Sequence, residues 1–188
     1  MRWLDKKWHK VVEKKLIEFE DEPYGKIIVH GGNDLRWEEA HSGAREEKIK
    51  LVTKVVFLLN TTKVGDRACV LASILVIVDI PEGITSIGIG SFEFCSSLKE
   101  IKFPKSLTSI GQYSFCNCSS LEKVDLLHTN VQYLGYYAFY YCTSLREMKV
   151  PDSLQTFGDL IFGGTKLVPS DINVSDSNAV VAYLRSIQ

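Results

Sequence analysis

Residues 92–111 read FEFCSSLKEIKFPKSLTSIG, and no other stretch of the chain constrains the fold as tightly. The same order of apolar residues returns 23 residues later from Phe115 and, after one extra residue near His128, 24 residues later from Phe139. A shorter copy begins at Leu154, and earlier copies extend back in steps of 23 to about Ile49. The apolar columns of the repeat are those of Phe92, Cys95, Leu98, Ile101, Phe103, Leu107 and Ile110. Chance does not hold so many columns in register, so the chain is built from repeats.

Each repeat has the pattern of a strand followed by a turn. Leu98, Ile101 and Phe103 alternate toward one face as in a strand, and Pro104 ends that strand. Such a repeat can bury its apolar columns only when another repeat stacks on it. A fixed period in the low twenties therefore predicts a leucine-rich-repeat solenoid, an α/β fold of about five coils of 23 residues each.

The open ends of such a stack expose apolar side chains and strand edges, so caps are expected at both ends. Residues 2–20 carry apolar side chains every three or four positions and predict an amphipathic helix, and a short strand is predicted over 26–30. These elements belong to a predicted N-terminal cap over residues 1–48, before a solenoid over 49–168. Its tryptophans are large enough to cover the first coil: Trp3, Trp8 and Trp37.

A second cap is predicted within residues 169–188. Residues 175–177 offer an N-cap for a short capping helix from about Asn178. The apolar side of this helix would consist of Val180, Tyr183, Leu184 and Ile187.

Composition excludes several classes of protein. The chain carries 22 Lys and Arg against 23 Asp and Glu, a formal charge of −1, which leaves no net field to hold nucleic acid or an acidic membrane surface. The apolar runs at 55–59 and 68–80 are shorter than the roughly 20 residues of a membrane-spanning helix. Residues 1–10 hold no uninterrupted apolar signal segment. We therefore expect no nucleic-acid partner, no membrane insertion and a cytoplasmic location.

The run Phe-x-x-Cys-x-x-Leu-x-x-Ile-x-(apolar)-Pro-x-x-Leu-x-x-Ile-Gly resembles the BspA-like, or Treponema-type, class of leucine-rich repeats. The resemblance covers roughly residues 50–168, about two thirds of the chain. It implies non-catalytic recognition of proteins, often in adhesion or attachment on the surfaces of bacteria and protists, and it does not imply one ligand. The cell surface is therefore the alternative location.

Five cysteines without a signal segment favour reduced thiols. Cys95, Cys118 and Cys142 fall in one column that also holds Ala72 and Thr165, so we interpret them as small buried core residues. A disulfide between adjacent coils and a metal site are the alternatives. Cys116 lies outside the column and is expected to be the most exposed thiol.

Outward strand positions carry alternating charge from one repeat to the next. The three columns are Lys99, Glu122 and Arg146, then Glu100, Lys123 and Glu147, then Lys102, Asp125 and Lys149. Opposite charges should face each other between coils and contribute about 0.2–1 kcal/mol per pair. We interpret these columns as a solubilising scaffold, with a charge-complementary protein partner as the alternative.

One cluster of aromatic residues is not needed for the stacking of the repeats. Its members occupy the intervening positions of three neighbouring turns: Phe94, Tyr113, Tyr136, Tyr137, Tyr140 and Tyr141. If they point outward they form an aromatic patch that binds a partner protein, because tyrosine gives broad contact area at low entropic cost. The alternative is that some of them pack against flanking turns as secondary core.

Motifs for enzymatic chemistry are absent from the sequence, and the four histidines are scattered. A polar cluster at residues 34–41 is the weak metal candidate outside the cysteines. We therefore predict a non-catalytic protein–protein interaction module without cofactor or metal, including a role in adhesion or surface recognition. The competing prediction is a structural subunit or scaffold, docked into a larger intracellular assembly through its N-terminal segment. An enzyme with its site in residues 1–48 ranks behind both of these predictions, because that stretch is too short to build a pocket alone. The sequence indicates no oligomeric state.

Overall fold

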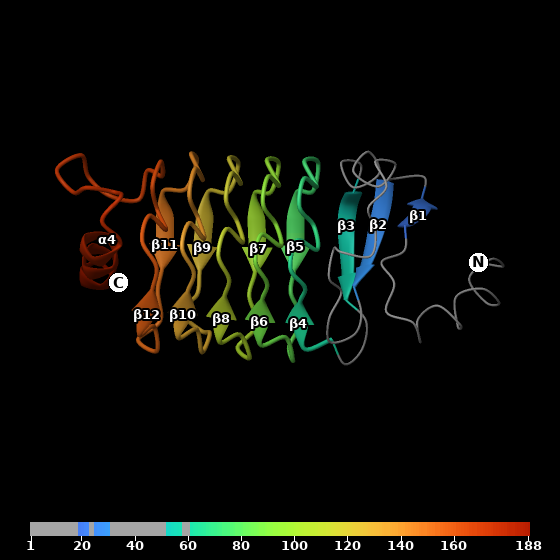
Figure 1. Cartoon of the computed structure of the whole chain (residues 1–188), viewed down its shortest axis with the longest axis horizontal. Coiled ribbons are helices and arrows are strands. Elements are labelled where there is room, and N and C mark those ends of the chain that lie inside the picture. The colour runs from blue at the N-terminus through green and yellow to red at the C-terminus, as the bar shows by residue number, and fades with distance from the viewer. Residues whose placement is uncertain (1–18, 23–24, 31–51, 58–60) are drawn as a thin grey trace.

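A computed structural model describes residues 19–22, 25–30, 52–57 and 61–188. Its main body is a β-solenoid of about four turns in which every coil contributes two short strands, except the last, which contributes only β12 (Figure 1). One strand of each coil joins a parallel five-stranded sheet in the order β12-β10-β8-β6-β4. These strands are β4 (Lys63–Val64), β6 (Ser86–Ile87), β8 (Ser109–Ile110), β10 (Tyr133–Leu134) and β12 (Thr156–Phe157).

The other strand of each coil lies on the opposite side of the stack. These strands are β5 (Ile77–Asp79), β7 (Glu100–Lys102), β9 (Lys123–Asp125) and β11 (Glu147–Lys149). They form two separate parallel pairs, β5 with β7 and β9 with β11. In each strand the middle residue is buried and the first is exposed, as the alternation in the sequence predicts.

The core is a set of continuous side-chain columns. Leu98, Leu121 and Leu145 are fully buried and form one spine through successive coils. A parallel column of phenylalanines stacks ring on ring, with centroid separations of 5.3 Å for Phe92–Phe115 and 5.3 Å for Phe115–Phe139. Backbones approach so closely between coils that a Cβ on Gly135 would clash with the amide nitrogen of Gln112. The repeat therefore buries its apolar columns by stacking, as predicted.

The N-terminal part differs from the prediction. Strand β1 (Phe19–Glu22) pairs antiparallel with β2 (Gly25–His30), and β2 pairs parallel with β3 (Val52–Phe57). The strand predicted over 26–30 is confirmed. The helix predicted over 2–20 is wrong at its end, because pairing with Ile27 and Ile28 places Phe19 and Glu20 in a strand.

Other N-terminal predictions lie outside the described residues. They include the remainder of that helix, the three tryptophans and the polar cluster at 34–41. The solenoid has about four turns instead of five, because β3 joins the sheet of β1 and β2 and the start of the first predicted coil falls outside the described residues.

The C-terminal helix α4 (Ser177–Ser186) confirms the predicted cap helix. The Asp176 carboxylate accepts hydrogen bonds from the amides of Asn178 and Ala179, at 3.0 and 3.2 Å. The helix packs Val180, Val181 and Leu184 against the core. Ile187, predicted on this face, is instead 58% exposed because the helix ends before it.

The same helix satisfies backbone groups of the last coils. The amide of Ile161 donates to the Ser177 hydroxyl, and the Arg185 guanidinium donates to the carbonyl of Leu154 at 2.7 Å. These bonds cover groups that would otherwise face solvent at the end of the stack.

Candidate functional site

The turns that follow β4, β6, β8, β10 and β12 share an unusual backbone. Two positions in each turn have a positive φ between 54° and 79°. The first column of these positions is Arg67, Gly90, Tyr113, Tyr137 and Leu160, and the second is Leu71, Phe94, Asn117, Tyr141 and Gly164. The spacing of the repeat thus forces a left-handed residue at the same two places in every coil.

Glycine or asparagine would be the least strained residue at these positions. A residue with a Cβ adopts the left-handed region at a cost of about 1–2 kcal/mol relative to glycine. Gly90, Asn117 and Gly164 show that the fold accepts such residues in both columns. Nevertheless Phe94, Tyr113, Tyr137 and Tyr141 are bulky aromatics. The turn does not require an aromatic residue, because the same columns also hold Arg67, Leu71 and Leu160.

The six clustered aromatic residues, which we call the aromatic ridge, divide into two groups. Four are exposed: Phe94 at 43%, Tyr113 at 38%, Tyr136 at 45% and Tyr141 at 49%. Tyr137 and Tyr140 are half-buried. Both interpretations of the sequence therefore describe part of the cluster, since two tyrosines pack as secondary core and four aromatics face solvent.

The tyrosine rings form a continuous strip across two coils. Tyr113 stacks on Tyr137 with centroids 5.0 Å apart. Tyr140 lies edge-on to Tyr137 at 5.2 Å and to Tyr141 at 4.6 Å. Such stacked and edge-to-face contacts fix the rings in place before any partner arrives.

Glycines in the next coil make room for the ridge. A Cβ on Gly163 would lie 2.6 Å from the Tyr140 ring carbon Cε2, so this ring occupies the space that a side chain would need. A Cβ on Gly158 would likewise lie 2.6 Å from the backbone nitrogen of Tyr136 and 2.7 Å from its ring carbon Cγ. Desolvation and the neighbouring Tyr141 raise the pKa of the Tyr140 hydroxyl further above its ordinary value of 10.0, so this hydroxyl, like other tyrosines, is neutral near pH 7. The ridge is an uncharged surface at its centre.

The cysteines behave as core residues. The thiols of Cys95, Cys118 and Cys142 donate to backbone carbonyls of the preceding coil at 3.1–3.2 Å. All five cysteines are free and buried, and burial raises the pKa of each thiol, to about 12 for Cys69. Cys116 is the least buried of the five, but only 4% of its surface is exposed. Among the described residues no group of three His, Cys, Asp or Glu side chains could hold a metal ion.

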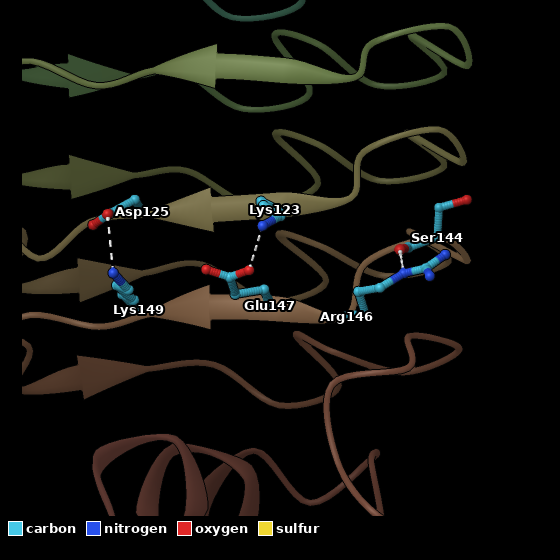
Figure 2. A network of polar contacts seen from close by, with 6 residues as sticks. All are labelled: Lys123, Asp125, Ser144, Arg146, Glu147 and Lys149. Atoms are coloured by element: carbon cyan, nitrogen blue, oxygen red, sulfur yellow. Dashed lines mark hydrogen bonds and ion pairs between the residues drawn. The ribbon is translucent and has the colours of Figure 1, made fainter. Parts of the chain in front are cut away.

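The charged strand columns form two of the predicted pairs, and between these described residues the remaining predicted pairs, such as Glu100 with Lys123 and Lys102 with Asp125, are not formed. Lys123 Nζ lies 2.7 Å from Glu147 Oε2, and Lys149 Nζ lies 3.8 Å from Asp125 Oδ2 (Figure 2). Both pairs join β9 to β11, and all four side chains are substantially exposed. They contribute little stability and keep this surface soluble.

Comparisons with known proteins agree with this architecture. The model of the BspA type leucine rich repeat region matches residues 62–183, more than half of the chain, with 6 copies. No curated protein matches the sequence. In the part of the chain that the structure describes, no helix is long and apolar enough to cross a bilayer.

Solved structures show the same fold. A leucine rich cell surface protein from Faecalibacterium prausnitzii A2-165 aligns with a TM-score of 0.57 at 22% identity, over 81% of this chain and 48% of that one. This chain therefore spans about half the length of the Faecalibacterium protein. A leucine rich repeat protein of T. pallidum aligns with a TM-score of 0.57 at 21% identity, over 90% of this chain and 94% of that one.

Proposed function

The chain belongs to the BspA-type leucine-rich-repeat family, and we propose that it is a non-catalytic module that binds another protein through the aromatic ridge. The observation that carries the proposal is the placement of Phe94, Tyr113 and Tyr141. All three are exposed, and all three occupy left-handed backbone positions at which the same turns accept glycine or asparagine.

The packing of the aromatic ridge on the solenoid supports the same function. Its half-buried members, Tyr137 and Tyr140, rest on the solenoid and hold the exposed rings in fixed orientations. A preorganised aromatic surface loses little side-chain entropy on binding, and tyrosine is enriched at the energetic centres of interfaces. The ridge fits a flat, largely uncharged protein surface.

Adhesion or attachment at a cell surface is the biological setting that we propose first for this binding. The Faecalibacterium structure with the same fold is described as a cell surface protein. A cytoplasmic location is the alternative, and fractionation of the source cell with an antibody to this chain distinguishes the two.

A structural subunit is the second candidate function, and one observation favours it. The first outward position of β5 and the residue before it are apolar: Ile77 is 54% exposed and Val76 is 41% exposed. The next coils place charged residues at these positions, namely Lys99 and Glu100 in the coil that contains β7. A permanent partner docked near β5 would cover this apolar surface.

Site-specific photo-cross-linking in the source cell tests the proposed function. A benzophenone amino acid at position 136 or 141 is expected to capture one defined protein, whereas the same group at the exposed control position 127, outside the ridge, captures none. The captured protein is then purified and its binding to the intact chain is measured. Capture from position 77 alone, together with aggregation of the isolated chain in size-exclusion chromatography with light scattering, would instead support the structural subunit.

A further inference from the structure

Three Asn-x-Ser/Thr triplets occur in the chain, and each matches the acceptor motif for an N-linked oligosaccharide. They begin at Asn60, Asn117 and Asn173. Asn60 lies outside the described residues, and the structure distinguishes the other two. A transferase that acts on a folded chain needs the triplet at the surface, with its carboxamide nitrogen and hydroxyl free, in a backbone that can enter the active site of the enzyme.

The triplet at Asn173 lies in the segment that joins β12 to α4, at the C-terminal end of the solenoid (Figure 1). No residue between Phe157 and Ser177 belongs to a helix or a strand in this fully described segment. Asn173 and Ser175 are both exposed, and Val174 between them packs partly buried against the core. The two groups that a transferase recognises therefore lie at the surface.

The polar groups of this triplet are free to react. The Asn173 oxygen Oδ1 accepts a hydrogen bond from the Ser175 amide at 3.0 Å, which folds the triplet into a tight turn. The Asn173 nitrogen Nδ2 and the Ser175 hydroxyl make no hydrogen bond to any described residue. An enzyme can therefore engage both groups without displacing a partner within this part of the chain.

The backbone around the triplet is not tied to the stack by hydrogen bonds. The Lys166 amide donates to the Leu145 carbonyl of the preceding coil at 2.8 Å. Beyond it, the described backbone bonds stay within the segment until α4 begins, and the last of them runs from the Asp176 amide to the Asn173 carbonyl at 2.9 Å. Residues 167–175 can therefore enter the active site of another protein without loss of a hydrogen bond between coils.

The triplet at Asn117 is held inside a turn of the stack. Its nitrogen Nδ2 donates to the Cys116 sulfur at 3.2 Å. The middle residue, Cys118, is fully buried, and the Ser119 hydroxyl donates to the Ser96 carbonyl of the preceding coil at 3.3 Å. Because the middle residue belongs to the core, modification of this triplet requires a coil to open. The fold thus presents one of the two described triplets and withholds the other.

An acidic residue gives the exposed triplet a second distinguishing feature. Asp171 is exposed and lies two positions before the acceptor, so residues 171–175 read Asp-Ile-Asn-Val-Ser. Bacterial oligosaccharyltransferases select Asp or Glu at this position, where a basic group of the enzyme can pair with the carboxylate. Neither of the other two triplets has an acid there, and the equivalent residue before Asn117 is the buried Phe115.

We propose that Asn173 is the acceptor of an N-linked oligosaccharide, an inference that rests on the cell-surface setting proposed above. The donor is an oligosaccharide carried on a polyprenyl diphosphate. The nitrogen Nδ2 attacks sugar carbon C1, a C1–N bond forms and the bond from C1 to the diphosphate oxygen breaks. The diphosphate leaves with the electron pair, and one proton of Nδ2 passes to a base of the transferase. The site uses none of the ridge residues, so it does not depend on what the ridge binds.

Transfer to the purified, folded chain tests the site directly. The full chain is incubated with a purified bacterial oligosaccharyltransferase and a polyprenyl-diphosphate-linked oligosaccharide, and its tryptic peptides are analysed by mass spectrometry. Trypsin releases residues 167–185 and 106–123 as separate peptides, each with one of the two triplets. We expect one added oligosaccharide on 167–185 and none on 106–123. Asn173→Gln and Asp171→Asn should each remove the transfer, and the matched control Asn117→Gln should leave it unchanged.

A eukaryotic transferase, which does not require the acid, isolates the effect of the fold. It is expected to modify the free peptides 167–185 and 106–123 alike, but only 167–185 in the folded chain. Transfer to 106–123 of the folded chain would overturn the structural argument. So would a folded chain that neither enzyme modifies although the free peptide 167–185 is a substrate.

The chain recovered from the source cell gives the final readout. Its 167–185 peptide is expected to carry an oligosaccharide, and an unmodified peptide overturns the proposal. Photo-cross-linking from positions 136 and 141 reports on the aromatic ridge separately. A modified chain that captures no partner would contradict ridge binding alone, and an unmodified chain that captures one would contradict only the acceptor site.

Discussion

The double variant Phe94→Asn, Tyr141→Asn separates binding from stability on the aromatic ridge. Both residues occupy the turn column in which the chain also carries Asn117 and Gly164. Asparagine relieves left-handed strain by about 1 kcal/mol at each position. The substitution also removes a side chain that is only about half buried, which costs about 1 kcal/mol at each position.

The ring contact of Tyr141 adds one further cost. Its edge-to-face contact with Tyr140, at 4.6 Å, is worth about 0.5–1.5 kcal/mol. The double variant is therefore expected to lose no more than about 2 kcal/mol of unfolding free energy, a fall in Tm of less than about 8 °C. Two interface aromatics at the centre of a binding surface are worth at least about 2 kcal/mol, so affinity for the cross-linked partner should fall at least about 30-fold.

Phe115→Ala is the matched control for this experiment. Phe115 is fully buried between Phe92 and Phe139, so its removal is expected to cost about 3–5 kcal/mol and to lower Tm by about 10 °C or more. Thermal unfolding followed by circular dichroism and partner binding followed by calorimetry give the two readouts. A large loss of stability in the double variant with unchanged affinity would refute the reasoning, because it would assign both aromatics to the core.

Three further predictions follow from individual contacts. Asp176→Ala should destabilise the chain by about 1 kcal/mol and lower Tm by about 2–4 °C, because the carboxylate caps α4 through two amides; an unchanged Tm in calorimetry would contradict this. A thiol reagent at pH 8 should modify the folded chain slowly and all five cysteines rapidly in urea, since burial raises the pKa of every thiol, to about 11 for Cys116; rapid modification of Cys116 in the folded chain would be the opposing result. Hydrogen bonds from the Lys105 and Ser106 amides lower the pKa of Glu82, so its ionised form stabilises the fold above the ordinary value of 4.5 and this contribution disappears as the pH falls through the lowered pKa. Glu82→Gln should therefore be less stable than the wild type at pH 7 and equally stable in strong acid, and a difference that persists in acid would exclude this cause.

The core was predictable because one period governs it. Each coil repeats the backbone of its neighbour, so Leu98, Leu121 and Leu145 must occupy equivalent places, and the structure confirms that they form one buried spine. The charge pairs of Lys123 and Asp125 with the next coil follow from the same register. The C-terminal cap helix was also predictable, because Asp176 marks its start.

The orientation of the tyrosines was not predictable from the repeat. Tyr136 and Tyr137 are adjacent in a turn, as are Tyr140 and Tyr141, and adjacent turn residues point in different directions. The structure exposes one of each pair and packs the other. The left-handed backbone at Tyr113 and Tyr141 could not be predicted from the sequence either, because such positions are usually recognised by a glycine or an asparagine.

The missing pairing between β7 and β9 could not be foreseen for a similar reason. The extra residue near His128 is visible in the sequence, but the sequence does not show that the amides of Glu122 and Phe103, which flank β9 and β7, donate no hydrogen bond to the neighbouring, fully described coil. Periodicity alone does not describe such local departures from the regular stack. At the N-terminus, strand pairing of Phe19 overrides a helical pattern for the same kind of reason. Location and domain boundaries stay predictions.

Hydrogen–deuterium exchange of the chain with and without its cross-linked partner tests the central claim most directly. Binding through the ridge should slow amide exchange in the turns at residues 111–118 and 135–142, which carry Tyr113 and Tyr136–Tyr141. Exchange in α4 and in β5 should stay unchanged. Protection confined to β5 or α4, with the two turns exchanging as in the free chain, would contradict recognition through the aromatic ridge.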